Sequence, residues 1–181
     1  MLNVYKYFDD AKSLPLYKEI GTKAHLLNFR AWRYEKHTKE DFEPIIHIIA
    51  RVPELSYHYA AEVSHSRFPE AEPVIMKSTS ACHYAMYIIK GRWKEAEPYI
   101  MKFPEYAFLY AREILATDQQ WTSQPGHENG RWPEAEPYIM KDPFNTYWYS
   151  IEIIRGRWPE AEPYIMKDPE YGQKYRNRYG F

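Results

Sequence analysis

The sequence predicts an all-α protein in which short two-helix repeats of about 25–26 residues stack as an α-solenoid. The first supporting observation is an eleven-residue segment that recurs four times, as RFPEAEPVIMK, RWKEAEPYIMK and twice RWPEAEPYIMK. These segments begin at Arg67, Arg92, Arg131 and Arg157. The steps between them are 25, 39 and 26 residues, so the long step contains an insertion of 13 residues at 117–129.

The second observation is a repeated signal for the start of a helix. Asp142-Pro143 and Asp168-Pro169 each place a carboxylate, which can accept hydrogen bonds from first-turn amides, directly before a proline. Proline lacks an amide hydrogen, and the first turn has no partner for one. Each pair therefore predicts the start of the second helix in its unit.

The first helix of each unit is expected to be short, because the repeated segment contains two prolines four residues apart. Pro137 cannot lie deep in a regular helix, so the helix starts late, near Glu134 or Glu136, or kinks there. Gly91 and Gly156 are expected to end second helices, since glycine adopts a positive φ at little cost.

The repeats divide the chain into two regions. Residues 1–38 do not fit the pattern and predict a divergent helical N-terminal cap, whereas residues 39–181 predict the helical repeat domain. The predicted units lie near 40–66, 67–91, 92–130 with the insertion at 117–129, 131–156 and 157–181. The last unit is expected to cap the array, because Lys174, Arg176 and Arg178 give it a polar outer face.

The composition argues against several classes of protein. The chain has 181 residues, with 24 Lys+Arg against 25 Asp+Glu, and this net charge of −1 disfavours a broad electrostatic contact with nucleic acid or anionic lipid. Cys82 is the one cysteine, so an intrachain disulfide is excluded. No apolar run reaches the roughly 18 residues of a membrane span. The start, MLNVYKYFDDAKS, lacks the apolar run of a signal peptide, so we expect a cytoplasmic protein.

The repeated segment GRWPEAEPYIMKDPEY resembles a tandem repeat of hypothetical proteins from large tailed bacteriophages and some bacteria. The resemblance covers about residues 67–175 and leaves residues 1–38 outside it. It implies a helical repeat protein of viral or mobile-element origin, but it implies no activity and no site residues. The first repeat departs from the pattern, with Phe68 in place of tryptophan and Ser78-Thr79 in place of Asp-Pro.

Repeated glutamates and tryptophans are interpreted as parts of the scaffold. A catalytic acid–base pair is needed once, whereas a Glu pair occurs in every clear unit. The tryptophans are expected to fill the contact between units while the preceding arginine pairs with a nearby glutamate. The alternative is that they stack on nucleic-acid bases. The glutamate pairs are Glu70/Glu72, Glu95/Glu97, Glu134/Glu136 and Glu160/Glu162, and the tryptophans are Trp93, Trp132 and Trp158.

Neither a metal site nor a catalytic centre is predicted. His58, Glu62 and His65 could share one helix face, but the H-E-x-x-H spacing is absent and ordinary polar-face histidines are the default. Cys82 is expected to be a buried structural thiol. Glycine-rich phosphate-binding motifs are absent, so the sequence predicts no cofactor and no enzyme activity.

The insertion at 117–129 supplies the candidate binding residues Trp121, His127 and Glu128. Its many turn-forming residues predict an irregular, exposed loop, and such loops often gather on the binding face of a repeat protein. Trp121 has no counterpart in the other units and could anchor an interface. The alternative is that Trp121 folds back and shields its own unit.

Protein binding is the function that these patterns favour, because stacked repeats form an extended surface and Tyr, Trp and Arg carry much interface energy. The phage resemblance makes a host protein the expected partner. Nucleic-acid binding and the sequestering of a small, nucleotide-like ligand between the N-terminal region and the repeats remain alternatives. The oligomeric state stays open.

Overall fold

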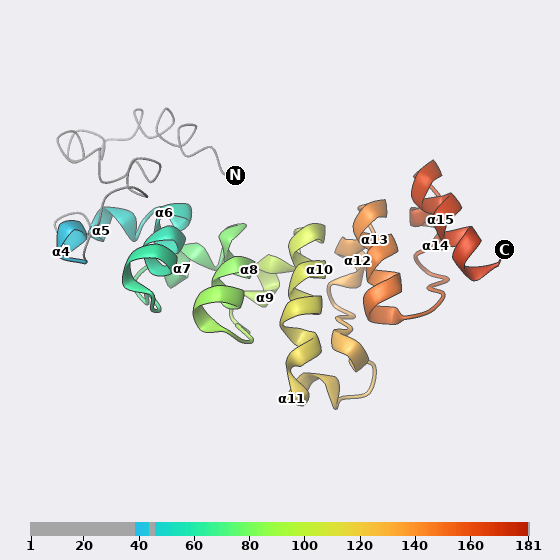
Figure 1. Ribbon diagram of the computed structural model, residues 1–181, viewed down its shortest axis with the longest axis horizontal. Coiled ribbons are helices and arrows are strands. Elements are labelled where there is room, and N and C mark those ends of the chain that lie inside the picture. Colours follow the sequence, from blue (N-terminus) through green and yellow to red (C-terminus); the bar gives the residue numbers. More distant parts are fainter. Residues whose placement is uncertain (1–38, 44–45, 181) are drawn as a thin grey trace. The chain divides into compact units, whose positions relative to one another are not determined.

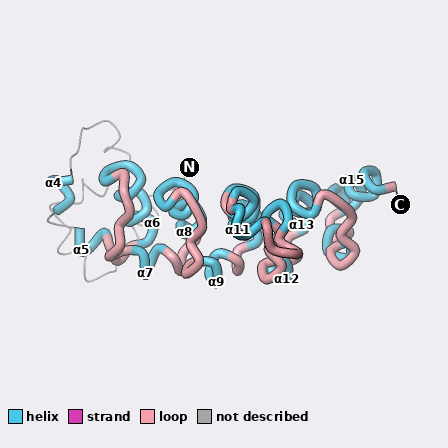
Figure 2. Tube along the Cα trace, turned by 90° about the horizontal axis from the view of Figure 1, so that it is seen from below, coloured by secondary structure: helices cyan, strands magenta, loops and turns pink. Residues whose placement is uncertain are grey.

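The computed structural model describes residues 39–43 and 46–180, and every regular element in this part of the chain is a helix (Figure 2). The all-α prediction is therefore confirmed for these residues. They fall into two compact parts that divide between Val74 and Ile75. The predicted helical cap, residues 1–38, lies outside the described residues.

Each clear repeat begins with a helix of only four residues. In α9 the first residue is Glu97, and Pro98 occupies the second position, where its missing amide hydrogen costs no helical hydrogen bond. Of the two predicted possibilities, a late start near either glutamate or a kink, the structure shows the late start, at the second glutamate of each pair. The four helices are α7 (Glu72–Ile75), α9 (Glu97–Ile100), α12 (Glu136–Ile139) and α14 (Glu162–Ile165).

The second helices begin where the Asp-Pro pairs predict. The Oδ1 atom of Asp142 accepts from the amide of Asn145 at 2.8 Å, and Oδ1 of Asp168 accepts from the amides of Glu170 and Tyr171 at 2.9 and 3.0 Å. Both aspartates therefore cap their helices. The second helices in residues 75–180 are α8 (Ser80–Tyr84), α10 (Pro104–Glu113), α13 (Pro143–Tyr149) and α15 (Pro169–Tyr179).

Several second helices continue into a short irregular helix. A π-helical turn follows α8 as η3 (Ala85–Ile89) and α13 as η6 (Ser150–Ile154). After these turns, Lys90 and Arg155 adopt left-handed φ values of 58° and 56°. The prediction that Gly91 and Gly156 supply the positive φ is thus wrong by one residue. A basic residue suits this place, because its charge lies beside the exposed carbonyls of a helix end.

Consecutive second helices pack against one another within residues 75–180. Helix α8 contacts α10, α10 contacts α13, and α13 contacts α15 (Figure 1). The short first helix of the next unit also packs on the second helix before it, as α12 does on α10 and α14 on α13. Within residues 75–180, each second helix therefore contacts the second helix that follows it in the chain.

The described residues before Ile75, 39–43 and 46–74, show a less regular version of the same pattern. Before α7, the helices described there are α4 (Lys39–Phe42), α5 (Ile46–Ile49), α6 (Pro53–His58) and the π-helical η2 (Tyr59–Ser64). The ring of Tyr59 packs against Phe42 and Phe68, with centroids 5.6 and 5.2 Å away. The hydroxyl of Ser56 donates to the Ile49 carbonyl at 2.7 Å and ties α6 to α5.

The insertion is more ordered than its composition predicts. It contains α11 (Gln119–Thr122) and a 3₁₀ turn, η5 (Glu128–Gly130), and follows the 3₁₀ turn η4 (Leu115–Thr117). Asp118 caps α11 by accepting from the amides of Gln120 and Trp121 at 2.9 and 3.2 Å. Gly130 has a φ of +84°, and a Cβ atom there would come within 2.5 Å of the Ala111 carbonyl oxygen. The expectation of an irregular loop is therefore wrong for about half of this segment, whereas Trp121 is the one buried residue in 117–129, so the expected exposure agrees with most of it.

Candidate functional site

The repeated residues form a contact that we call the joint, defined in one unit by Arg92, Trp93, Glu97 and Tyr110. The amide of Trp93 donates to the Tyr110 hydroxyl at 2.7 Å, and this hydroxyl donates to Glu97 at 3.2 Å. Arg92 donates two hydrogen bonds to the same carboxylate, at 2.6 and 2.9 Å. All four polar groups thereby satisfy one another inside the scaffold.

The aromatic rings link each joint to the next. The ring of Tyr110 lies 5.4 Å from that of Trp132, which belongs to the following unit. The same contact joins Tyr84 to Trp93 at 5.2 Å and Tyr149 to Trp158 at 5.3 Å. Equivalent joints consist of Arg131, Trp132, Glu136 and Tyr149, and of Arg157, Trp158, Glu162 and Tyr175.

Burial makes the joint a structural feature. Trp132 is 2% exposed and Tyr149 is fully buried. Burial raises the pKa of the Tyr149 phenol, and the neighbouring Glu136 carboxylate raises it further. The hydrogen bond to Glu136 raises the pKa of Arg131. The predicted pairing of repeat arginines with glutamates, and the packing role of the tryptophans, are confirmed.

Trp121, a predicted binding residue, is only 5% exposed and so is no surface anchor. Its indole nitrogen donates to the Arg131 carbonyl at 3.0 Å. One face of its ring stacks on His127, with centroids 4.1 Å apart, and the Arg92 guanidinium lies 4.0 Å from its centroid. The insertion therefore folds back over a joint, as in the alternative interpretation of Trp121.

His127, Glu128 and Trp121 do not form one continuous binding surface. His127 is half-buried in its stack on Trp121, whereas Glu128 is exposed. The amides of Glu128 itself and of Gly126 hold the pKa of the Glu128 carboxyl below its usual value. This hydrogen bonding shapes the turn, so the structure gives the three predicted residues a mainly local role.

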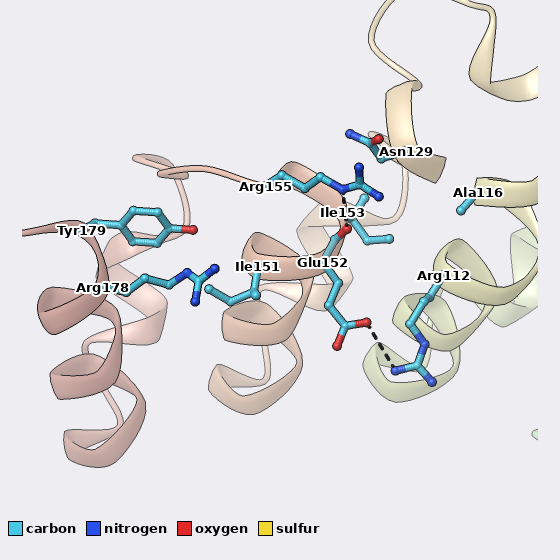
Figure 3. A pocket seen from close by; sticks show the side chains of 9 residues that line it. All are labelled: Arg112, Ala116, Asn129, Ile151, Glu152, Ile153, Arg155, Arg178 and Tyr179. Atoms are coloured by element: carbon cyan, nitrogen blue, oxygen red, sulfur yellow. Dashed lines mark hydrogen bonds and ion pairs between the residues drawn. The ribbon is translucent and has the colours of Figure 1, made fainter.

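A different feature of residues 75–180 has the form of a binding site. We call it the arginine groove: an open cavity of about 600 Å³, within the range of roughly 300–1,000 Å³ typical of ligand pockets (Figure 3). It draws residues from α10, η4, η5, η6 and α15, that is, from three units in succession. Its lining consists of Arg112, Ala116, Asn129, Ile151, Glu152, Ile153, Arg155, Arg178 and Tyr179.

Three guanidinium groups face this cavity with a single carboxylate. Arg112 donates to Glu113 at 2.7 Å and lies 3.5 Å from Glu152. The Nε atom of Arg155 donates to the backbone carbonyl of Glu152 at 3.3 Å. In the part of the chain that the structure describes, neither Arg155 nor Arg178 has a carboxylate within ion-pair distance. The groove therefore carries an excess of positive charge.

The groove residues vary from unit to unit, unlike those of the joint. Two residues after Tyr84, Tyr110, Tyr149 and Tyr175, successive units carry Met86, Arg112, Ile151 and Asn177. Three residues after it, they carry Tyr87, Glu113, Glu152 and Arg178. Sequence reasoning missed this groove because it sought unusual residues in the insertion. The available signal was the change in chemistry at these two places along an otherwise constant repeat.

The insertion contributes to the groove through a residue that was not predicted. Asn129 lines the cavity and has a left-handed φ of 56°. Its neighbour Gly130 packs against Ala111 and Ala116, which fixes the end of the insertion beside α10. The insertion thus shapes one wall of the groove, whereas Trp121, His127 and Glu128 do not line it.

The other candidate residues form no further site. His58 pairs with Glu62 at 3.0 Å, but His65 is exposed and left-handed after the end of η2. The described residues contain no cluster of three metal-ligating side chains. Cys82 is fully buried, and burial, with smaller effects from Glu113 and Glu105, raises the pKa of its thiol to about 12. A thiol with that pKa is a poor nucleophile at neutral pH.

No protein-family model, no curated protein and no solved structure matches this chain. Within residues 39–43 and 46–180, the helices are too short and too polar for any of them to span a bilayer. Because no similar protein indicates a function, a functional proposal has to rest on the geometry of the groove and the joints.

Proposed function

We propose that this chain is a non-enzymatic protein-binding module, that its units stack as an α-solenoid, and that the arginine groove is its binding surface. The observation that carries the proposal is that the second helices contain two sets of residues that differ in how much they vary between units. The joint residues repeat and satisfy one another, whereas the groove residues change in size and charge between units. A binding surface can vary in this way without disturbing the contacts between units.

The composition of the groove also suits a protein partner. Arginine and tyrosine are enriched at protein interfaces, and Arg178 and Tyr179 lie together at one end of the groove (Figure 3). The repeated glutamates, which could suggest acid–base catalysis, are used in the joints or exposed. This supports a binding role in preference to an enzymatic one.

The resemblance of the repeat to hypothetical phage proteins extends the proposal to a host protein as partner and to the host cytoplasm as location. Nucleic-acid binding is the second candidate, because aromatic side chains recur in every unit. The buried positions of Trp93, Trp132 and Trp158 weigh against it, since their rings are not available for stacking on bases.

The test is recovery of a partner from a bacterial lysate with the full chain as bait. Ile151→Trp should fill the groove without changing its charge, and it should be tolerated because equivalent places hold side chains as large as Met86 and Arg112. Lys94→Trp, at an exposed residue outside the groove, is the matched control.

A single stoichiometric protein that binds the wild type and the Lys94→Trp variant, but not the Ile151→Trp variant, would support the proposal. Recovery that nuclease abolishes would favour the nucleic-acid alternative. Equal recovery by both variants would overturn the assignment of the groove.

A further inference from the structure

We propose that the arginine groove recognises an acidic segment of the partner protein, with side-chain carboxylates bound by Arg155 and Arg178. This inference rests on the proposed function and specifies the chemistry of the partner. It follows from charge, from the geometry of the available donors and from the apolar wall of the groove.

The first argument is the unequal pairing of the groove's charges. Arg112 shares the carboxylates of Glu113 and Glu152, so its charge is largely compensated. Arg155 donates one hydrogen bond to a backbone carbonyl, and Arg178 is exposed on the last turn of α15. A guanidinium carries five N–H donors, so Arg155 and Arg178 both retain N–H groups that can donate to an incoming acceptor. The groove thus offers two cations for incoming anions.

The second argument is the fit between guanidinium and carboxylate. Arginine presents a planar pair of donors that matches the two oxygens of a carboxylate. The joints of this protein use that geometry repeatedly, as Arg157 does with Glu162 at 2.8 and 2.9 Å. An aspartate or glutamate of a partner can make the same paired contact with Arg155 or Arg178.

The third argument is that the groove is not uniformly charged. Ile151 is half-buried beside the cavity, and Tyr179 presents a half-buried ring at its edge (Figure 3). In Figure 3 the Arg178 guanidinium points toward Ile151. These apolar groups can pack against the methylene groups of acidic side chains. A peptide segment therefore fits better than an inorganic anion.

A nucleic-acid backbone fits this surface less well than an acidic peptide. Glu152 lies within the groove, and Glu134 and Glu160 are exposed in the same compact part of the chain. Nucleic-acid binding needs a continuous track of positive charge, since it depends on neutralising many phosphates. A short segment with a few carboxylates needs only the two cations that the groove provides.

The probe is a fluorescently labelled hexaglutamate peptide, titrated with the full chain at low salt. Hexaglutamine is the uncharged comparison, and a six-nucleotide single-stranded DNA is the phosphate comparison. Hexaglutamate should bind at least about tenfold more tightly than either, and high salt should weaken it because exposed ion pairs are screened.

Substitutions in the groove should move the affinity in opposite directions. Arg155→Gln with Arg178→Gln should weaken hexaglutamate binding by about tenfold or more, whereas Glu152→Gln should tighten it severalfold by removing a competing carboxylate. Lys94→Gln with Lys102→Gln also removes two positive charges, and Glu95→Gln also removes one negative charge, but at exposed places outside the groove, so both should have little effect. Circular dichroism melting would verify that each variant is folded.

Equal binding of hexaglutamate and hexaglutamine, or equal losses in Arg155→Gln/Arg178→Gln and Lys94→Gln/Lys102→Gln, would overturn the inference. Tighter binding of the DNA would replace it with nucleic-acid recognition. If a protein partner is lost with Ile151→Trp but retained with the double arginine variant, the proposed function stands and this inference fails. If hexaglutamate binds as expected but no protein is recovered, the proposed function fails instead.

Discussion

The joints and the arginine groove lie on the same second helices, but their residues differ in how much they vary between units. Tyr149, the last residue of α13, is fully buried in a joint, while Ile151 and Glu152, two and three residues later in η6, line the groove. The joint uses the same four residue types in three units. At equivalent places beside the groove, successive units carry different residues, such as Arg112 and Ile151.

This difference reflects the cost in stability of a substitution at each surface. A joint places a largely buried carboxylate and a buried phenol beside an arginine that is half-buried or exposed, and removing the phenol leaves a buried amide without its acceptor at a cost in free energy. Apart from the buried Ile153, the groove residues are half-buried or exposed, and a substitution at such a place costs little stability. Variation between units therefore marks the surface that is free to serve function. The following predictions test this contrast, starting with the largest expected effect.

Trp132→Ala should lower the free energy of unfolding by about 3–5 kcal/mol, since it removes a large ring that is 2% exposed. Chemical denaturation monitored by circular dichroism measures the loss. Phe144→Ala removes an aromatic ring from α13 that is 47% exposed and should cost far less. Equal losses would show that the joint has no special place in the stability of the fold.

Tyr149→Phe should cost about 1–3 kcal/mol, because the buried Trp132 amide loses the acceptor it reaches at 2.7 Å. Tyr87→Phe removes a hydroxyl from a side chain that is 56% exposed and should leave stability unchanged. Urea denaturation of the two variants gives the comparison. A neutral result for Tyr149→Phe would mean that water or a shifted backbone replaces the hydroxyl.

Alkaline pH should weaken the joints as a group. The pKa of Tyr149 is raised above its usual 10.0 in the folded protein, so its contribution to stability is complete below about pH 10 and declines as the pH rises above that value. The free energy of unfolding should thus be flat through neutral pH and fall in the alkaline range. Tyr149→Phe should make the alkaline decline shallower, and an identical slope in both proteins would contradict the assignment.

The two glutamates of one pair should differ in their effect on stability. Glu136→Gln should cost about 1 kcal/mol, because Arg131 loses a charged acceptor contacted at 2.7 and 3.2 Å, although its 38% exposed side chain can still be solvated. Glu134→Gln, at the exposed member of the pair, should cost less than about 0.5 kcal/mol. Thermal melts of both variants measure the difference, and two equal shifts would place Glu134 in the joint as well.

Much of the joint could be predicted from sequence because its residues repeat at fixed spacings. The recurrence of Arg-Trp before Glu-Ala-Glu-Pro predicted the packing role of Trp132 and the pairing of Arg131 with a nearby glutamate. Asp142 and Pro143 gave the start of α13. The position of the left-handed residue was predicted wrongly. The conformational freedom of glycine favours Gly156, whereas the structure places the positive φ at Arg155, where a positive charge lies beside the carbonyls of the helix end.

The groove and the insertion could not be predicted in the same way. The turn-forming residues of the insertion suggest exposure, but Trp121 finds a carbonyl, an imidazole and a guanidinium to pack against, and these lie up to 29 residues away in sequence, at Arg92. The groove collects Arg112, Arg155 and Arg178 from three units. Their proximity depends on how helices pack, which no local pattern specifies.

Arg155 connects the two surfaces, because it lines the groove from a left-handed backbone conformation with a φ of 56°. Glycine adopts this conformation without the steric cost that other residues bear, so Arg155→Gly should raise the free energy of unfolding by up to about 1 kcal/mol. The same change should weaken hexaglutamate binding, since it removes one of the two groove cations.

Lys90→Gly is the matched control, since Lys90 has a φ of 58° at the equivalent helix end but does not line the groove. It should increase stability by a similar amount and leave hexaglutamate binding unchanged. Such a result would show that Arg155 is kept at some cost to the fold for the sake of the groove. A loss of stability in Arg155→Gly alone would instead show that its hydrogen bond to the Glu152 carbonyl supports the end of η6, and would assign Arg155 to the scaffold.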